Sequence, residues 1–515
     1  MRLRLLLCWI CAFVLLANDC AFAQSRAVRA VGSYWRSHES EIVDELVEFL
    51  KLPNVAADIP SMRRNAEALL EMMAGRGIEA RLLETAGPPY VFGELRVPAA
   101  TRTILFYAHY DGQPVDPSRW VGHDPFTPVL RDAPLEAGGR IIDFPTHEKY
   151  DPDWRLYARS AADDKSPIVA MLVALDALRA GSVDPTANLK FLFEGDEEAG
   201  SPNLGALVRE HRELLMADLV VAADGPRDPS VRPTLYFGAR GIVSAEVTVY
   251  GPLRPLHSGH YGNWAPNPAM RLAQLLATMK DPETGRIRVD GFYDDVVPLT
   301  DFEVQAIAEA PNDDLEQMQT FAIAAPESDG SRLLLLNQPS LNVRGLRSGW
   351  VGSEARTIVP DRAIASIDLR LVKAIDPGEQ VRRLIAHIER QGYHVVTDEP
   401  DPDTCRRYPR LARVVTSDGY PAFRTSMDLP VSRALIAAVE THTGQSPVKL
   451  PTLGGSVPLY QFTDVLRVPT VGIPIVNHDN NQHGADENLR LQNLRDGIAI
   501  FGQVFARLGE LWPEG

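Results

Sequence analysis

Residues 191–201 read FLFEGDEEAGS, an apolar run that ends in a dense group of carboxylates. The apolar part belongs to 188–195 (NLKFLFEG), which has the length and composition of a buried strand. Four of the five residues from Glu194 to Glu198 are acidic. Because like charges this close repel one another, the cluster indicates either a solvated turn or a site that holds something strongly positive.

The segments around this stretch alternate between strand and helix patterns. Buried strands are expected at 102–108 (RTILFYA) and 217–225 (ADLVVAADG), and a helix at 166–181, with Pro167 early and Gly181 as its stop. A helix is also expected within 34–75, and the α/β pattern returns at 430–444 and 468–476. This alternation predicts an α/β domain with a mostly parallel sheet and helices on both faces.

A second pattern begins near Gly241. Alternating strands at 242–251 and 363–372 and helices at 268–279 and 379–392 are typical of a small sheet with helices on one face. Residues 281–350 interrupt this set as an insertion. We therefore expect a smaller α+β domain at 241–400, inserted between the two parts of the first domain, residues 24–240 and 401–515.

The N-terminus has the features of a targeting segment. MRLR supplies a basic start, residues 5–17 are an apolar run that is short for a membrane span, and AFAQ (21–24) offers a small-residue cleavage site. We expect 1–23 to be a secretory signal peptide, with the bacterial periplasm as destination. An uncleaved anchor is the alternative, but Asn18 and Asp19 end the apolar run.

Cysteine usage and charge limit the classes of partner. Three of the four cysteines lie in the expected signal peptide, so the mature chain keeps only Cys405 and can form no internal disulfide. The formal net charge of the chain is −16, which argues against nucleic-acid binding, since that needs a basic face. No later apolar stretch reaches the length of a membrane span, so no membrane contact is expected after cleavage.

Side chains with metal-binding chemistry follow the ends of the expected strands. They are His109, Asp111, Glu197, Glu198 and Asp224, with His483 after a further loop, and they are joined by Asp163 and Asp164 just before the helix that starts near Pro167. Each alone is explained by a turn, a helix cap or a solvated loop. In an open parallel sheet, however, the carboxyl ends of the strands line one ligand crevice, and independent turns do not predict a shared edge.

Two imidazoles and several carboxylates suit a pair of divalent metals such as zinc. Two cations a few ångströms apart repel each other, so they need a bridging carboxylate and a bridging hydroxide. Such a pair can acidify a water and polarise a carbonyl. One further carboxylate must stay free to shuttle the proton.

The sequence resembles the co-catalytic zinc peptidases that include carnosinase-type dipeptidases, aminoacylase and the bacterial glutamate carboxypeptidases. The matching stretches are AHYDGQP (108–114), SAADDKSP (160–167), FEGDEEAGS (193–201), VAADG (221–225), HSGHYG (257–262) and HGADEN (483–488). The stretches GRIRVDGFYDDVVP (285–298) and ARTIVPDRAIASIDLRLV (355–372) look closest to the carnosinase-type dipeptidases, whose longer inserted domain accounts for 281–350.

The resemblance implies a role for each residue of the first domain, with two Zn²⁺ per subunit and Mn²⁺ or Co²⁺ as alternatives. Glu197 is then the general base, and Asp111 orients an imidazole or tunes the base. The implied metal ligands are His109, the bridging Asp163, Glu198, Asp224 and His483.

In the inserted domain the resemblance implies a lid and dimerisation function, and hence a homodimer. His257 is expected to reach across the dimer and help hold the oxyanion. Arg370 is expected to bind the substrate's carboxylate, for which a planar guanidinium is well suited. In the second part of the first domain, backbone N–H groups of Gly454, Gly455 and Ser456 are candidates for the same carboxylate, although a plain Gly-Gly turn explains them nearly as well.

The resulting hypothesis is a secreted dizinc metallopeptidase that cleaves dipeptides or short peptides with a free C-terminal carboxylate. A metal-bridged hydroxide attacks the carbonyl, and Glu197 moves the proton. The first alternative is an aminoacylase-like deacylase of N-acyl amino acids that uses the same metals. The second is a non-catalytic binding protein, which is disfavoured because all expected ligands are present. Residues 133–154 lengthen the segment before Asp163, which leaves the substrate preference open.

Overall fold

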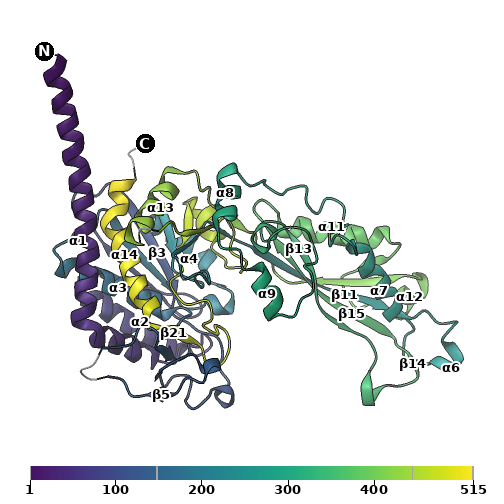
Figure 1. Ribbon diagram of the computed structural model, residues 1–515. Helices are drawn as coiled ribbons and strands as arrows, with labels where there is room; N and C mark the ends of the chain where they lie inside the picture. The colour runs from purple at the N-terminus through teal and green to yellow at the C-terminus, as the bar shows by residue number, and fades with distance from the viewer. Residues whose placement is uncertain (1, 146–148, 444, 513–515) are drawn as a thin grey trace. The chain divides into compact units, whose positions relative to one another are not determined.

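The structure is a computed structural model that describes residues 2–145, 149–443 and 445–512 (Figure 1). The acidic stretch lies at the end of β7 (Asn188–Glu194), which belongs to an eight-stranded sheet. The order is β1-β2-β7-β3-β8-β20-β9-β19. The other strands are β1 (Glu79–Leu83), β2 (Tyr90–Leu95), β3 (Thr103–His109), β8 (Leu219–Ala222), β20 (Thr470–Gly472), β9 (Thr234–Tyr236) and β19 (Val448–Leu450).

The centre of this sheet is parallel. β3 pairs in parallel with β7 and β8, and β8 pairs in parallel with β20. The β1–β2, β2–β7 and β20–β9 pairs are antiparallel. The predicted α/β class is confirmed, and the strands that were expected to carry the polar site are the parallel ones.

Neighbouring residues of β3 show that both faces of the sheet are covered. The ring of Phe106 packs against Phe501 and Phe505 of α14 (Leu491–Leu511). The next residue, Tyr107, packs against Phe462 of the π-helical turn Gln461–Leu466. Because side chains alternate along a strand, these contacts lie on opposite faces. Every residue of β3 after Thr103 is buried, as the apolar run predicted.

Two helices precede the sheet. α1 (Arg2–Leu50) has a non-helical residue at His38, and α2 (Ile59–Ala74) begins where the Asp58 side chain accepts the Ser61 N–H at 3.2 Å. The helix expected within 34–75 is therefore divided, since Pro53 disfavours helical geometry at the residue before it. The expected signal peptide, 1–23, falls in a segment whose side chains lie outside the described part of the structure. No helix among the described residues is long and apolar enough to cross a membrane.

A second sheet in this unit has four strands and pairs segments that precede Asp163 in the sequence with a segment that follows His483. Its order is β21-β6-β4-β5, from β21 (Asn488–Arg490), β6 (Arg155–Tyr157), β4 (Val129–Arg131) and β5 (Ile141–Ile142). Within 133–154, residues 146–148 lie outside the described residues. The helices of the unit also include α3 (Lys165–Ala180), α4 (Leu204–Glu210), α5 (Arg212–Leu215) and α13 (Pro430–Thr443).

The second unit is built on a five-stranded sheet, with β13-β15-β11-β17-β16 as its order. The strands are β13 (Ser340–Arg347), β15 (Arg362–Leu371), β11 (Gly241–Tyr250), β17 (Leu411–Thr416) and β16 (His394–Val396). Leu272 of α7 (Pro268–Met279) and Leu384 of α11 (Pro377–Arg390) join Val247 and Ile367 in one buried core. This is the small α+β domain that the sequence predicted.

The remaining strands and α-helices of the second unit are short. They are β10 (Gly238–Ala239), β12 (Leu256–His257), β14 (Ile358–Val359), β18 (Phe423–Arg424), α6 (Ser258–Tyr261), α8 (Asp301–Glu309), α9 (Asp314–Thr320), α10 (Arg332–Leu335) and α12 (Pro402–Arg407).

The boundaries of the second unit differ from the expected 241–400. The unit comprises Gly238–Arg424 and Pro451–Tyr460, and the first comprises Met1–Phe237, Thr425–Leu450 and Gln461–Gly515. The expected end at residue 400 would separate β17 from β11, with which it forms an antiparallel ladder. A boundary inside a sheet would leave backbone groups unpaired, and the local pattern around residue 400 does not show that pairing.

Candidate metal centre

The predicted site residues of the first unit come from a strand end and from loops at one edge of the large sheet. His109 is the last residue of β3, Asp224 lies two residues after β8, and Glu197 and Glu198 form a short 3₁₀ turn that follows β7. Since these three strands are parallel neighbours, their carboxyl ends meet at the same edge.

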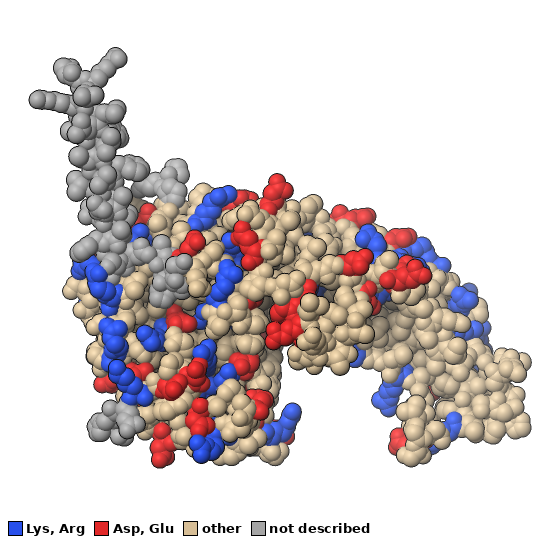
Figure 2. Space-filling view, viewed as in Figure 1, with Lys and Arg blue, Asp and Glu red and all other residues tan. Residues whose placement is uncertain are grey.

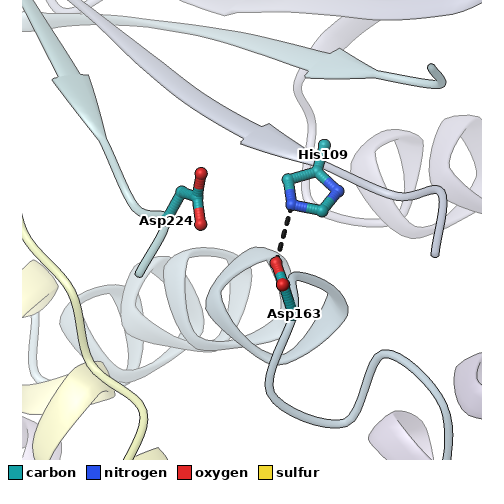
Figure 3. Close-up of side chains that lie close together, drawn as sticks. All are labelled: His109, Asp163 and Asp224. Carbon is teal, nitrogen blue, oxygen red and sulfur yellow. Dashed lines mark hydrogen bonds and ion pairs between the residues drawn. The ribbon is translucent and has the colours of Figure 1, made fainter. Parts of the chain in front are cut away.

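Asp163 reaches the same place from the loop before α3, and His109, Asp163 and Asp224 form the first of two potential metal-binding groups (Figure 3). One donor atom from each lies within 4.8 Å of the others, and all three residues are buried. His109 Nε2 is 2.9 Å from Asp163 Oδ1.

The second group consists of Asp163, Glu198 and His483. His483 Nε2 lies 3.2 Å from Asp163 Oδ2 and 3.3 Å from Glu198 Oε2. Asp163 therefore belongs to both groups and presents one carboxylate oxygen to each. A carboxylate that bridges two cations must occupy such a position, and the neighbouring Asp164 belongs to neither group.

The carboxyl groups around Asp163 resist ionisation, whereas Asp163 itself does not: burial opposes its ionisation, but hydrogen bonds with His109 and His483 lower its pKa. Burial, followed by repulsion from Asp163, raises the pKa of Glu198 to about 7 and that of Asp224 to about 6. Burial also raises the pKa of Glu197. The hydrogen bond to Asp163 raises the pKa of His483 to about 8. Among the described residues, no lysine or arginine forms an ion pair with Asp163, Glu198 or Asp224.

These groups fit a pair of zinc ions. Buried carboxylates are costly unless a cation balances their charge, and here only imidazoles lie close to them. Two nitrogen and several oxygen donors in two sets, joined by one shared carboxylate, match the ligand preferences of zinc. His109, Asp163 and Asp224 would hold one ion, and Asp163, Glu198 and His483 the other.

Asp111 connects the first group to the acidic turn. Its carboxylate accepts the backbone N–H groups of Glu197 at 3.1 Å and Glu198 at 3.0 Å. The same carboxylate lies 3.3 Å from Nδ1 of His109. Asp111 can thus fix both the orientation of the imidazole and the backbone that carries the base. Glu197 itself belongs to neither group, so its carboxylate remains available for proton transfer.

Glu487 is a supporting residue that the sequence reasoning missed. It is fully buried, and its carboxylate accepts the backbone N–H groups of Ser160, Ala162 and Asp163 at 2.8–2.9 Å. Arg159 donates to it at 2.7 Å. Glu487 therefore ties the loop that carries His483 to the loop that carries Asp163. Its only signal in the sequence is its place inside HGADEN.

Two glutamines contact predicted ligands and were also missed. Gln113 Nε2 donates to Glu198 Oε2 at 2.7 Å, and Gln482 Nε2 donates to Asp163 Oδ2 at 3.3 Å. Gln113 lies inside AHYDGQP and Gln482 directly precedes HGADEN, but an uncharged side chain does not stand out in a search for metal ligands. Such donors orient the ligating carboxylates.

Glu194 and Asp196 are the two acids of the opening stretch for which the sequence predicted no role, and both have a structural role. Glu194 is fully buried and accepts the hydroxyl groups of Tyr90 at 2.6 Å and Tyr107 at 2.7 Å. Asp196 accepts from Asn203 at 2.6 Å. Burial, and then repulsion by Asp196, raises the pKa of Glu194 to about 8. These bonds anchor the turn before and after Glu197.

The remaining predicted residues belong to the second unit. Arg370 Nη1 donates to Ser456 Oγ at 2.7 Å, and its Nε lies 3.5 Å from Asp368. The Gly455 carbonyl accepts the backbone N–H of Arg240 at 3.1 Å. His257 is exposed, and its Nδ1 accepts the Gly259 N–H at 3.0 Å. The structure thus brings Arg370 and the 454–456 turn together, while the role of each stays a prediction.

Comparison with known proteins identifies the same family that the motifs indicated. A family model described as peptidase family M20/M25/M40 matches residues 105–507. The chain is 26% identical to human Beta-Ala-His dipeptidase over 509 residues, which is 93% of this chain and 92% of that protein. It is 26% identical to the Cys-Gly metallodipeptidase of Schizosaccharomyces pombe over 496 residues, 92% of this chain and 97% of that one.

Solved structures give the same result. The M20 metallo-carboxypeptidase Sso-CP2 from Sulfolobus solfataricus superposes with a TM-score of 0.74 at 28% identity, covering 91% of this chain and 99% of that one. Human carnosine dipeptidase 1 superposes with a TM-score of 0.70 at 25% identity, covering 94% and 99%.

Proposed function

The chain belongs to peptidase family M20/M25/M40 and is a metallodipeptidase, and from that premise we propose that it is a secreted dizinc enzyme that cleaves dipeptides with a free C-terminal carboxylate, with Glu197 as general base. The observation that carries this proposal is the pair of donor groups that share Asp163, with Glu197 beside them but in neither. The relatives named above cleave β-Ala-His and Cys-Gly according to their names, which supports dipeptides as the substrate class.

Proton transfer in the proposed mechanism depends on Glu197. When bound, the two zinc ions supply the Lewis acidity that activates water and polarises the scissile carbonyl. Glu197 accepts a proton from the attacking water and returns it to the leaving amine. Burial raises the pKa of Glu197, which strengthens it as a base once ionised. Asp111 holds the Glu197 backbone N–H at 3.1 Å and so keeps the base in position.

Recognition of the substrate is assigned to the second unit. Arg370 offers a guanidinium for the C-terminal carboxylate, and its bond to Ser456 fixes the direction of that group. Backbone N–H groups of the 454–456 turn are further candidate donors in this proposal. His257 is assigned the oxyanion, to which an exposed imidazole can donate.

The test is a substrate panel with zinc-loaded enzyme. The panel contains β-Ala-His, Cys-Gly and dipeptides with charged or apolar C-terminal residues, the same dipeptides as C-terminal amides, and N-acetyl amino acids. We expect turnover of free dipeptides and a large loss with the amides, because the amides lack the charge that Arg370 is proposed to bind. Faster turnover of N-acetyl amino acids than of any dipeptide would establish the deacylase alternative instead.

Export and dimerisation are part of the proposal. Residues 1–23 support export through their basic start, apolar run and AFAQ site. A mature N-terminus at Gln24 in protein recovered from the periplasm would establish it, and an intact Met1 there would contradict it. Dimerisation is supported by large exposed apolar side chains in the second unit, among them Leu253, Trp264, Met270 and Val351.

A further inference from the structure

A cavity of ≈ 380 Å³ lies within the second unit, and none of its lining residues belongs to the predicted metal centre or to the proposed substrate contacts. Its size falls in the range of small-molecule sites, roughly 300–1,000 Å³. It is lined by residues of α9, α10, the segment between them and the start of β13, together with Arg240.

Most of the cavity wall is apolar. Met318, Phe321, Ile323, Leu335 and Leu336 provide it. Phe321 is 65% exposed and Ile323 is 47% exposed, which are high values for side chains of this size. The apolar wall is therefore open to solvent on the side of these two residues. An apolar surface that remains accessible in this way is suited to an apolar ligand group.

Arg240 places a cation in this apolar setting. The residue is only 7% exposed and lines the cavity. Its Nη2 donates to the Gln338 carbonyl at 2.7 Å and to Ser340 Oγ at 3.1 Å, whereas its buried Nε has no acceptor among the described residues. No carboxylate of the described chain forms an ion pair with it. Asp368 attracts Arg240 only from beyond ion-pair distance, so the buried cation lacks a direct counter-charge. That is costly, and a bound anion would remove the cost.

The other charges near the cavity do not supply that anion. Arg332 and Asp314 also line the cavity, but the Arg332 backbone N–H donates to Asp314 at 3.2 Å and the Arg332 side chain donates to Asp313 at 2.7 Å. Arg370 is held by Asp368 and Ser456 and does not line the cavity. Burial and then repulsion by Arg370 lower the pKa of Arg240 to about 10, so it stays protonated at neutral pH.

We propose that this cavity binds a monocarboxylate that carries an apolar alkyl or aromatic group, with the carboxylate on Arg240 and the apolar group against Met318, Phe321 and Leu336. Guanidinium and carboxylate are matched in charge and geometry. The other polar side chains of the wall already have contacts within the protein: Arg332 with Asp313 and Asp314, Gln317 with Asp313, and Ser340 with Arg240. Two sources share this chemistry: a free aliphatic acid, and an apolar amino acid released by the enzyme.

Calorimetric titration of the zinc-loaded protein with octanoate tests the proposal. Octanamide, which has the same apolar chain without the charge, is the matched ligand. We expect octanoate to bind and octanamide to bind at least about tenfold more weakly, because a charge-assisted hydrogen bond is lost. Arg240→Gln should raise the dissociation constant for octanoate about tenfold. Arg382→Gln, which removes an exposed charge on α11, is the control and should leave it unchanged.

A second variant keeps the proposal testable if Arg240→Gln does not fold. Ile323→Trp enlarges a half-exposed wall residue and should weaken octanoate binding while Arg240 stays in place. Competition with leucine distinguishes the two sources. If leucine displaces octanoate from the wild type but not from either variant, the ligand is the product amino acid. If leucine does not compete, the ligand is the free acid. Octanoate binding that is absent, or equal in the wild type and both variants, as binding at the metal centre would be, overturns the proposal.

Discussion

At the scale of single residues, adjacent acids of the opening stretch do different work because they have different neighbours. Glu198 shares a potential metal-binding group with His483 and Asp163, whereas Glu197 shares none. The backbone N–H groups of both are held by the two oxygens of Asp111. The Asp111 side chain thus fixes the backbone of both residues. Glu198 belongs to the donor group, and the Glu197 carboxylate remains free.

The role of Glu197 is tested by Glu197→Gln. This change preserves shape but removes the basic oxygen, so we expect dipeptide turnover to fall by a factor of about 10²–10⁴ while the protein still holds two zinc ions. Turnover and zinc content of the purified variant are the measurements. Glu198→Gln is the contrast and should lose zinc. Wild-type turnover in Glu197→Gln would remove the residue from the mechanism.

Glu487 gives a second prediction at the residue scale, for a side chain that is not itself a predicted metal ligand. Glu487→Gln replaces an acceptor by a group that also donates, and it faces three backbone N–H groups and Arg159. We expect a loss of about 3–5 kcal/mol in unfolding free energy, because Arg159 is left buried without its partner. We also expect zinc affinity to fall about 10–100-fold, because the loop of Asp163 is released.

Denaturant unfolding and competition with a zinc chelator measure these two effects. Glu136→Gln is a matched control, since Glu136 accepts a bond from Asn481 of the same loop at the surface. Unchanged zinc affinity in Glu487→Gln, with only stability reduced, would show that Glu487 supports the fold and does not position Asp163.

At the scale of elements, β6 and β21 hold the loop of His483 against the rest of the first unit. Arg155 of β6 donates to Asp479 at 2.7 Å and to Asn488 of β21 at 2.9 Å. Burial opposes the ionisation of Asp479, but hydrogen bonds from Arg155 and Asn477 prevail and lower its pKa to about 2. A carboxylate whose pKa is lowered in the folded state stabilises the fold only where it is ionised.

This gives a pH-dependent prediction. The stabilisation by Asp479 should be complete above the unfolded pKa of about 4 and should disappear as the pH falls through 2. The side chain is 43% exposed, so solvent screening limits the effect to about 1 kcal/mol or less. Asp479→Asn should therefore melt at a lower temperature than the wild type at pH 7, with a much smaller difference at pH 2. A difference of equal size at both values would rule out the ion pair as its cause.

At the scale of the whole molecule, the second unit exposes large apolar side chains that the metal centre of the first unit does not account for. Trp264 is 80% exposed and Met270 is 60% exposed. On the face drawn in Figure 2, the part of this unit that carries α6 shows few charged side chains. Apolar surface of this kind, with few charges, is typical of a protein interface.

Trp264→Glu tests the proposed dimer. A carboxylate in an apolar interface has no partner, so we expect the variant to be monomeric by light scattering where the wild type is dimeric. Met216→Glu alters an exposed apolar residue of the first unit and should leave the mass unchanged. If His257 acts across the dimer, turnover should fall together with the mass. A monomeric wild type would contradict the proposed homodimer.

The sequence by itself determined the fold class, the family and the set of residues that the structure gathers at the predicted centre. Apolar runs such as 102–108 become strands because burial is a local property of composition, and the residue that follows a parallel strand must lie at the common edge. The order of the motifs along the chain also predicted which carboxylate follows which strand. These inferences needed only neighbours along the chain.

Only the tertiary structure decided what depends on contacts between distant segments. The shared place of Asp163 in two donor groups, the clamp by Glu487 and the pairing of β17 with β11 join residues that the sequence separates widely. The cavity beside Arg240 is another case, because an arginine in a sequence does not show whether a carboxylate will face it. The physical reason is that a side chain's charge, pKa and partners are set by the packing around it, which local pattern does not encode.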